Sequence, residues 1–86
     1  MLNLPESCGS RESANQLFST LTDPSPFINL TNVMISQGYA DQMCKIFIEK
    51  RIDSVVFINA TEKFQTNFLR AHRLRGGKFI VEFNTN

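Results

Sequence analysis

The chain has 86 residues, of which 42% are hydrophobic and 20% charged, and it contains eight phenylalanines. A chain of this length buries a modest fraction of its surface on folding, so one hydrophobic core is the most it can build. This composition excludes a disordered polar tail. The net charge of +1 gives no whole-chain attraction to nucleic acid or to an anionic membrane.

Cysteine spacing and hydropathy exclude several further classes of protein. Cys8 and Cys44 lie 36 positions apart, without the close pairs of a zinc site, and two cysteines are too few for a disulfide scaffold. Cys44 lies among apolar residues and is predicted to pack in the core. No apolar run approaches the roughly 20 residues that span a bilayer, and no signal segment opens the chain. We therefore expect an intracellular protein, cytoplasmic or nuclear, with no metal, no cofactor and no membrane contact.

The first 22 residues are predicted to form a lead-in and a short helix. Residues 1–10 combine Pro5, Gly9 and two serines with few apolar side chains, which indicates a flexible lead-in or linker remnant before a single domain over 11–86. Ser13 and Gln16 resemble a capping box. Apolar side chains at helical spacing predict a helix over about 11–22; they are Ala14, Leu17, Phe18 and Leu21.

Residues 27–36 are compatible with two structures. Pro24 and Pro26 must end the first helix, because each lacks a backbone donor and displaces the preceding residue from helical geometry. A helix after Pro26 would align Phe27, Leu30 and Met34 on one side. A strand is favoured by the β-branched residues Ile28, Thr31, Val33 and Ile35, and by the break at 36–38.

The second half of the chain has clearer periodicity. Residues 39–52 are predicted to form an amphipathic helix, with Asp41, Lys45 and Glu49 spaced for i,i+4 charge pairs. The apolar run 54–58 predicts a central strand covered on both faces. Asn59 is predicted to cap a helix that ends near 74–75 at the Gly76-Gly77 turn. Residues 79–83 then alternate as an edge strand.

These elements predict an α/β fold. The order is αβαβαβ, with a short, mostly parallel sheet joined by right-handed crossovers and helices packed on it. A sheet of three strands leaves its edges exposed unless another chain or segment covers them. Self-association, or a place within a longer protein, is therefore expected.

Candidate catalytic residues are scarce. His72 is the single histidine and lies among arginines, with no acid close in sequence to orient it, so we expect a surface histidine and not a general base. The carboxylates are scattered without a catalytic spacing. No glycine pattern of a phosphate loop surrounds Gly76-Gly77. The chain is therefore predicted to have no catalytic residue and not to be an enzyme.

Basic residues concentrate in the last third of the chain. Residues 1–62 contain seven acids and four bases, whereas residues 63–86 contain five bases against Glu82 alone. The five candidates for contact with nucleic-acid phosphates are Lys63, Arg70, Arg73, Arg75 and Lys78. The same cations also suit a helix C-terminus, where they offset the dipole, and that structural role is favoured.

Two functions follow from this sequence. The favoured one is a non-catalytic protein-interaction or assembly module of a larger intracellular protein. Its partner is another protein or a second copy of the chain, bound through a sheet edge or an apolar helix face. The alternative is binding of RNA or single-stranded DNA through the basic stretch 63–78.

Overall fold

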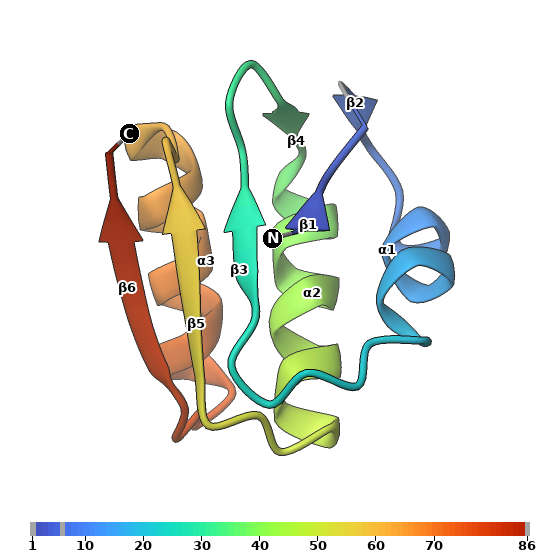
Figure 1. The fold of residues 1–86 in the computed structure, drawn as a ribbon, viewed down its shortest axis with the longest axis vertical. Coiled ribbons are helices and arrows are strands. Elements are labelled where there is room, and N and C mark those ends of the chain that lie inside the picture. The colour runs from blue at the N-terminus through green and yellow to red at the C-terminus, as the bar shows by residue number, and fades with distance from the viewer. Residues whose placement is uncertain (1, 6, 86) are drawn as a thin grey trace.

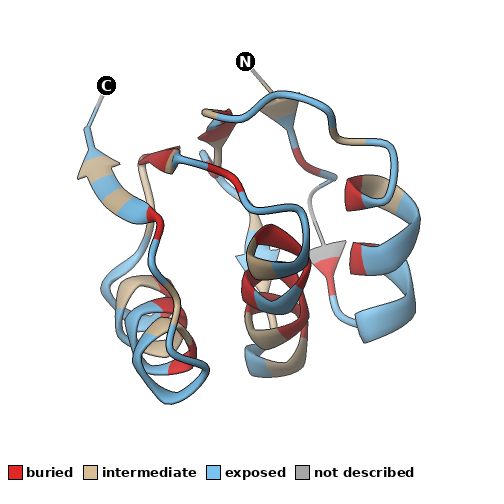
Figure 2. Cartoon of the chain, turned by 90° about the horizontal axis from the view of Figure 1, so that it is seen from below, coloured by how far each residue is buried: buried red, intermediate tan, exposed pale blue. Residues whose placement is uncertain are grey.

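A computed structural model describes residues 2–5 and 7–85 as two layers, one of strands and one of helices (Figures 1 and 2). The strands are β1 (Leu2–Asn3), β2 (Ser7–Cys8), β3 (Phe27–Asn29), β4 (Met34–Ile35), β5 (Ser54–Ile58) and β6 (Ile80–Asn84). The helices are α1 (Arg11–Phe18), α2 (Gln37–Glu49) and α3 (Glu62–Leu74). The predicted α/β class is confirmed.

The main sheet is parallel throughout, in the order β1-β3-β5-β6. Each crossover therefore steps to the next strand in the same direction. Right-handed crossovers that never reverse direction place every helix on the same face of a sheet. Figure 2 shows this arrangement, with all three helices beneath the strands of the main sheet. Strands β2 and β4 form a separate parallel pair beyond the carboxyl ends of β1 and β3 (Figure 1).

The main sheet is wider than predicted because β1 adds a fourth strand to it, and β2 contributes to the separate pair. β1 pairs with β3, β2 pairs with β4, and the side chains of Leu4 and Cys8 are buried. The sequence, which indicated a flexible lead-in or linker remnant here, did not predict these strand pairs or the burial of these two side chains. Two-residue strands have no periodicity to detect, and their pairing comes from backbone groups of distant partners.

Residues 27–36 form two short strands and not a helix. The favoured strand prediction is confirmed over 27–29 and 34–35, but a turn separates the two strands. Asn32 adopts a left-handed φ of 57°, and the Val33 N–H donates to the Leu30 carbonyl at 3.1 Å. Asparagine tolerates that conformation better than most residues.

Helix α1 begins at residue 11 as predicted, but the capping residues of α1 and α3 differ from those predicted. Ser10, and not Ser13, caps α1: its side chain accepts from the Ser13 N–H. Thr61, and not Asn59, caps α3 by accepting from the Phe64 N–H. Asn59 has a φ of 59°, whereas an N-cap residue takes the extended backbone conformation that Thr61 has.

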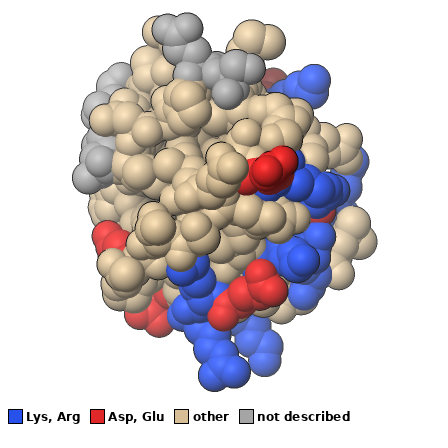
Figure 3. Space-filling view, turned by 90° about the vertical axis from the view of Figure 1, so that its right-hand side faces the viewer, with Lys and Arg blue, Asp and Glu red and all other residues tan. Residues whose placement is uncertain are grey.

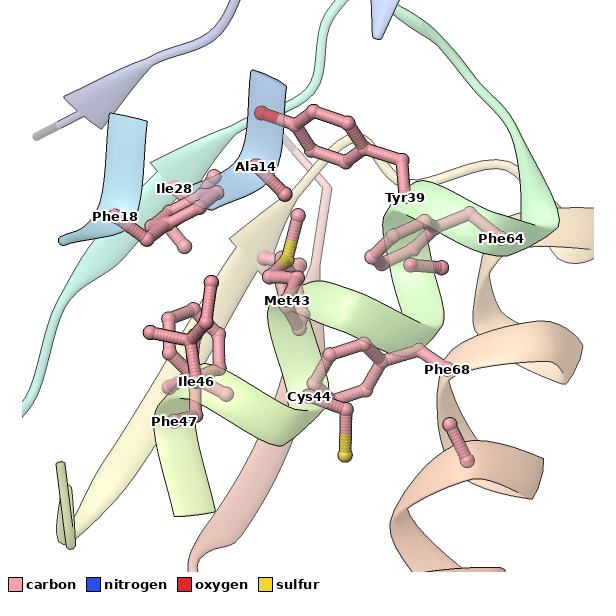
Figure 4. Packing of buried hydrophobic residues seen from close by; sticks show 14 of the residues in the cluster. Ala14, Phe18, Ile28, Tyr39, Met43, Cys44, Ile46, Phe47, Phe64 and Phe68 are labelled. Carbon is pink, nitrogen blue, oxygen red and sulfur yellow. The ribbon is translucent and has the colours of Figure 1, made fainter. Parts of the chain in front are cut away.

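Aromatic side chains connect the helices to the sheet. The Phe47 ring of α2 lies 5.4 Å from Phe18 of α1 and 6.2 Å from Phe68 of α3, measured between centroids. Phe68 lies 4.8 Å from Phe57 of β5, which stacks on Phe83 of β6. Figure 4 shows side chains of the three helices pointing into this shared core. Each such pair contributes about 0.5–1.5 kcal/mol beyond burial of its area.

Helices α2 and α3 end in the same hydrogen-bonding motif with different residues. After α3, the Gly76 N–H donates to Arg73 and the Gly77 N–H to His72, with Gly76 at a φ of 67°. After α2, Arg51 takes the position of Gly76, with a φ of 54°. Both ends are Schellman motifs, whose left-handed position favours glycine. Arg51 is therefore a strained residue in an otherwise regular helix end.

Replacement of Arg51 by glycine is expected to stabilise the protein. Relief of the left-handed strain exceeds the extra chain entropy of glycine, so the free energy of unfolding rises by about 0.5–1 kcal/mol. Gly76→Ala is the matched opposite change and lowers that energy by about 1 kcal/mol. Urea unfolding of both variants measures the difference. A loss of stability in Arg51→Gly contradicts the strain argument.

Candidate functional site

The predicted basic stretch does not form one surface. Lys63 lies in the first turn of α3, whereas Arg75 is the C-cap, so the helix places them about 18 Å apart along its axis. Arg70 and Arg73 are exposed on the outside of α3, and Lys78 follows the helix. On the side of the molecule that carries α1, away from α3, Lys and Arg side chains are also interspersed with Asp and Glu (Figure 3). Arg70 and Arg73 therefore lie together on α3, whereas Lys63 and Arg75 lie at its two ends.

Arg75 is engaged in an ion pair between helices. Its guanidinium binds both oxygens of Asp41, Nε to Oδ1 at 3.0 Å and Nη2 to Oδ2 at 2.7 Å. Arg11 of α1 binds the same carboxylate at 2.7 Å. The hydrogen bonds from these two guanidinium groups, with Arg75 the larger contributor, lower the pKa of Asp41 to about 2, although partial desolvation opposes them.

Amide side chains extend this polar cluster into the α1–α2 contact. Arg11 also donates to the buried Gln42 at 3.4 Å, and Gln42 donates to Asn15 at 2.8 Å. The cluster connects α1, α2 and the end of α3, so we assign it a structural role. The predicted i,i+4 partner of Asp41 was Lys45; the observed partners come from other helices.

His72 also has a structural role, because its ring forms a hydrogen bond with the backbone. Its Nε2 lies 2.8 Å from the Phe79 carbonyl oxygen, an acceptor, so Nε2 bears the proton and donates. The prediction was a surface histidine, and the side chain is partly buried. A Cβ on Gly77 would lie 2.6 Å from the His72 ring, which explains the second glycine of the pair. Gly76-Gly77 is thus a helix stop, as predicted.

Both cysteines are free and buried. Burial raises the pKa of each thiol, that of Cys44 to about 11, so both stay neutral. The prediction that Cys44 packs in the core is confirmed. Across residues 2–5 and 7–85, no three His, Cys, Asp or Glu side chains gather in a way that would hold a metal ion. No helix in that part of the chain has the length and apolarity to cross a membrane.

The face of the sheet opposite the helices is uncovered in the described structure (Figure 2). The register places its side chains in three rows across the strands. The row nearest the carboxyl ends is Asn3, Asn29, Ile58 and Asn84; the middle row is Phe27, Val56 and Glu82; the last row is Ser54 and Ile80. Phe27 and Ile80 are 49% and 68% exposed. We refer to these nine residues as the bare sheet face.

The sequence predicted strands of this face but not that the face is uncovered. The apolar run predicted that β5 is covered on both sides. Val56 and Ile58 are buried, but no helix of the described structure lies on their side of the sheet (Figure 2). Exposed Phe27 and Ile80 were not singled out. The sequence shows only alternation within 27–29 and 80–84. That alternation does not tell which face of the sheet the helices cover.

No protein-family model, curated protein or solved structure matches the chain.

Loss of the Asp41 charge is expected to destabilise the fold in a pH-dependent way. Its pKa is depressed in the folded state, so its contribution is present above about pH 4 and lost as pH falls through about 2. Because the carboxylate is 26% exposed and Arg11 more so, we expect Asp41→Asn to cost on the order of 1 kcal/mol at pH 7.

Denaturant titrations at pH 7, 4 and 2 measure this loss. Asp53→Asn, which neutralises an exposed carboxylate outside the cluster, is the control and stays within about 0.5 kcal/mol of the wild type. An Asp41→Asn deficit of the same size at pH 2 as at pH 7 would assign the effect to packing and not to the ion pairs.

Proposed function

We propose that the chain is a non-catalytic assembly module that binds a second copy of itself through the bare sheet face. The observation that carries this proposal is the exposure of Phe27 and Ile80 on a parallel sheet with helices on one side only. All-parallel sheets are almost always covered on both faces. A second sheet is a suitable cover, since two such faces stack about 10 Å apart.

The pattern of the face supports a second copy as the occupant. A twofold axis parallel to the strands superimposes each row on its own counterpart, so the Phe27 row meets the Phe27 row and the asparagine row meets the asparagine row. Glu82 is the single charge on this face and lies on the edge strand β6. The same axis places the two Glu82 residues near opposite edges, beyond the roughly 8 Å over which charges interact strongly at physiological salt.

The size of the face favours weak association. Four strands, up to five residues long, cover about 19 Å by 17 Å. A small specific interface needs about 600 Å² from each partner, roughly a ninth of the 5278 Å² accessible surface of the chain. The sheet supplies part of that area and its surrounding loops the remainder. We therefore expect a dissociation constant of tens of micromolar.

Sedimentation velocity between about 5 and 500 µM tests the proposal. The average mass should rise from the 9.8 kDa of one chain toward twice that value. Ile80→Lys should abolish the rise, because it places a charge within the interface at an already exposed position. Leu74→Lys is the matched control: Leu74 is 74% exposed at the end of α3, away from the sheet.

Three outcomes decide the question. Dimerisation lost in Ile80→Lys and kept in Leu74→Lys supports the proposal. A wild-type chain that stays monomeric over the whole range contradicts it. Equal loss in both variants also contradicts it, because association would then depend on net charge and not on the bare sheet face.

A further inference from the structure

A cavity of about 490 Å³ opens beyond the carboxyl ends of β3 and β5. Its walls come from the turn after β3, from the β2–β4 pair and from the first turn of α3. The lining side chains include Leu30, Val33, Met34, Ile35 and Phe64. This volume lies in the range of small-molecule sites. The cavity lies at one end of the sheet and does not overlap the bare sheet face.

The walls of the cavity are mainly apolar and neutral. Leu30 and Phe64 are buried, and Met34 stands exposed beside them with a flexible thioether that adapts to a bound molecule. Cys8 also lines the cavity, and burial keeps its thiol protonated by raising its pKa. Such walls favour an alkyl chain over a polar molecule.

The polar side chains of the cavity are not equivalent. Ser36 Oγ donates to the Gly9 carbonyl and accepts from the Tyr39 N–H, while Thr61 Oγ1 accepts from Phe64 N–H. Lys63 is the one charged residue in the lining, and no hydrogen bond or ion pair holds its amine among the residues described. Glu62, one position earlier, is not among the residues that line the cavity.

We propose that this cavity binds a free alkyl carboxylate of about ten carbons, with its chain against the apolar walls and its carboxylate on the Lys63 amine. Helices α2 and α3 both begin at the cavity, at Ser36 and Thr61, and their dipoles favour the same sign of ligand charge. The site is independent of the proposed self-association.

Calorimetric titration with matched ligands tests the head group and the chain separately. Decanoate should bind with a dissociation constant on the order of 100 µM. Decanol, which keeps the chain and lacks the charge, should bind about five-fold more weakly. Octanoate, which keeps the charge and loses two methylenes, should bind about ten-fold more weakly. Shifts of the Val33 and Ile35 methyl signals on addition of decanoate should locate the ligand.

Substitution of Lys63 tests the assigned contact. Lys63→Gln should weaken the binding of decanoate about five-fold and leave the binding of decanol unchanged, because only decanoate has a carboxylate that contacts the Lys63 amine. Lys63→Arg should restore most of the decanoate affinity. Lys63 is exposed, so both variants should keep the wild-type stability.

Several results would overturn the proposal. If decanoate binds no more tightly than decanol, the carboxylate makes no favourable contact with Lys63. If decanoate shifts no methyl signal of Val33 or Ile35, it does not bind in the cavity. Co-sedimentation with vesicles of phosphatidylglycerol and phosphatidylcholine, without binding of decanoate, would assign the same tail-and-anion chemistry to a lipid surface in place of a free acid.

Discussion

The handedness of the crossovers determines most of what this molecule exposes. Each connection from β1 through β3 and β5 to β6 is parallel and moves one strand further in the same direction. A right-handed crossover in that direction places its helix on one particular face of the sheet. The helices α1, α2 and α3 therefore share that face and a single core. The other side has no helix of its own. The strand order also never reverses, so the crevice that doubly wound sheets form at a switch point is missing from the described fold.

The elements with the strongest local pattern were predictable from sequence, and the long-range ones were not. The run 54–58 predicted both bounds of β5, and the periodicity of residues 39–52 predicted most of α2. β1 and β2 were missed because two residues are too few for a pattern. The cap of α3 was misplaced because Asn59 and Thr61 are both good capping residues, and only the backbone conformation distinguishes them.

The functional surfaces were less predictable, because each depends on what the fold leaves uncovered. The sequence placed Lys63 and Arg75 in one basic stretch, whereas the helix puts them at opposite ends and Asp41 engages Arg75. Conversely, Phe27 and Ile80 are far apart in sequence and share a face through the register of β3, β5 and β6. Charge clustering along a chain does not imply clustering in space, and apolar alternation does not say which face lacks a cover.

The parallel sheet also has a kinetic consequence. Paired residues are separated by 26 positions in Leu2↔Ile28, 29 in Phe27↔Val56 and 26 in Ser54↔Ile80. No hairpin exists among the described strands, so no strand pair can form before an intervening segment of more than twenty residues has closed. Closing a segment of that length lowers the chain entropy before any hydrogen bond between strands can offset the cost in free energy. Such topologies therefore fold more slowly than helical bundles of equal size. During synthesis, β1 leaves the ribosome before β3, so the strand with which it pairs is not yet available.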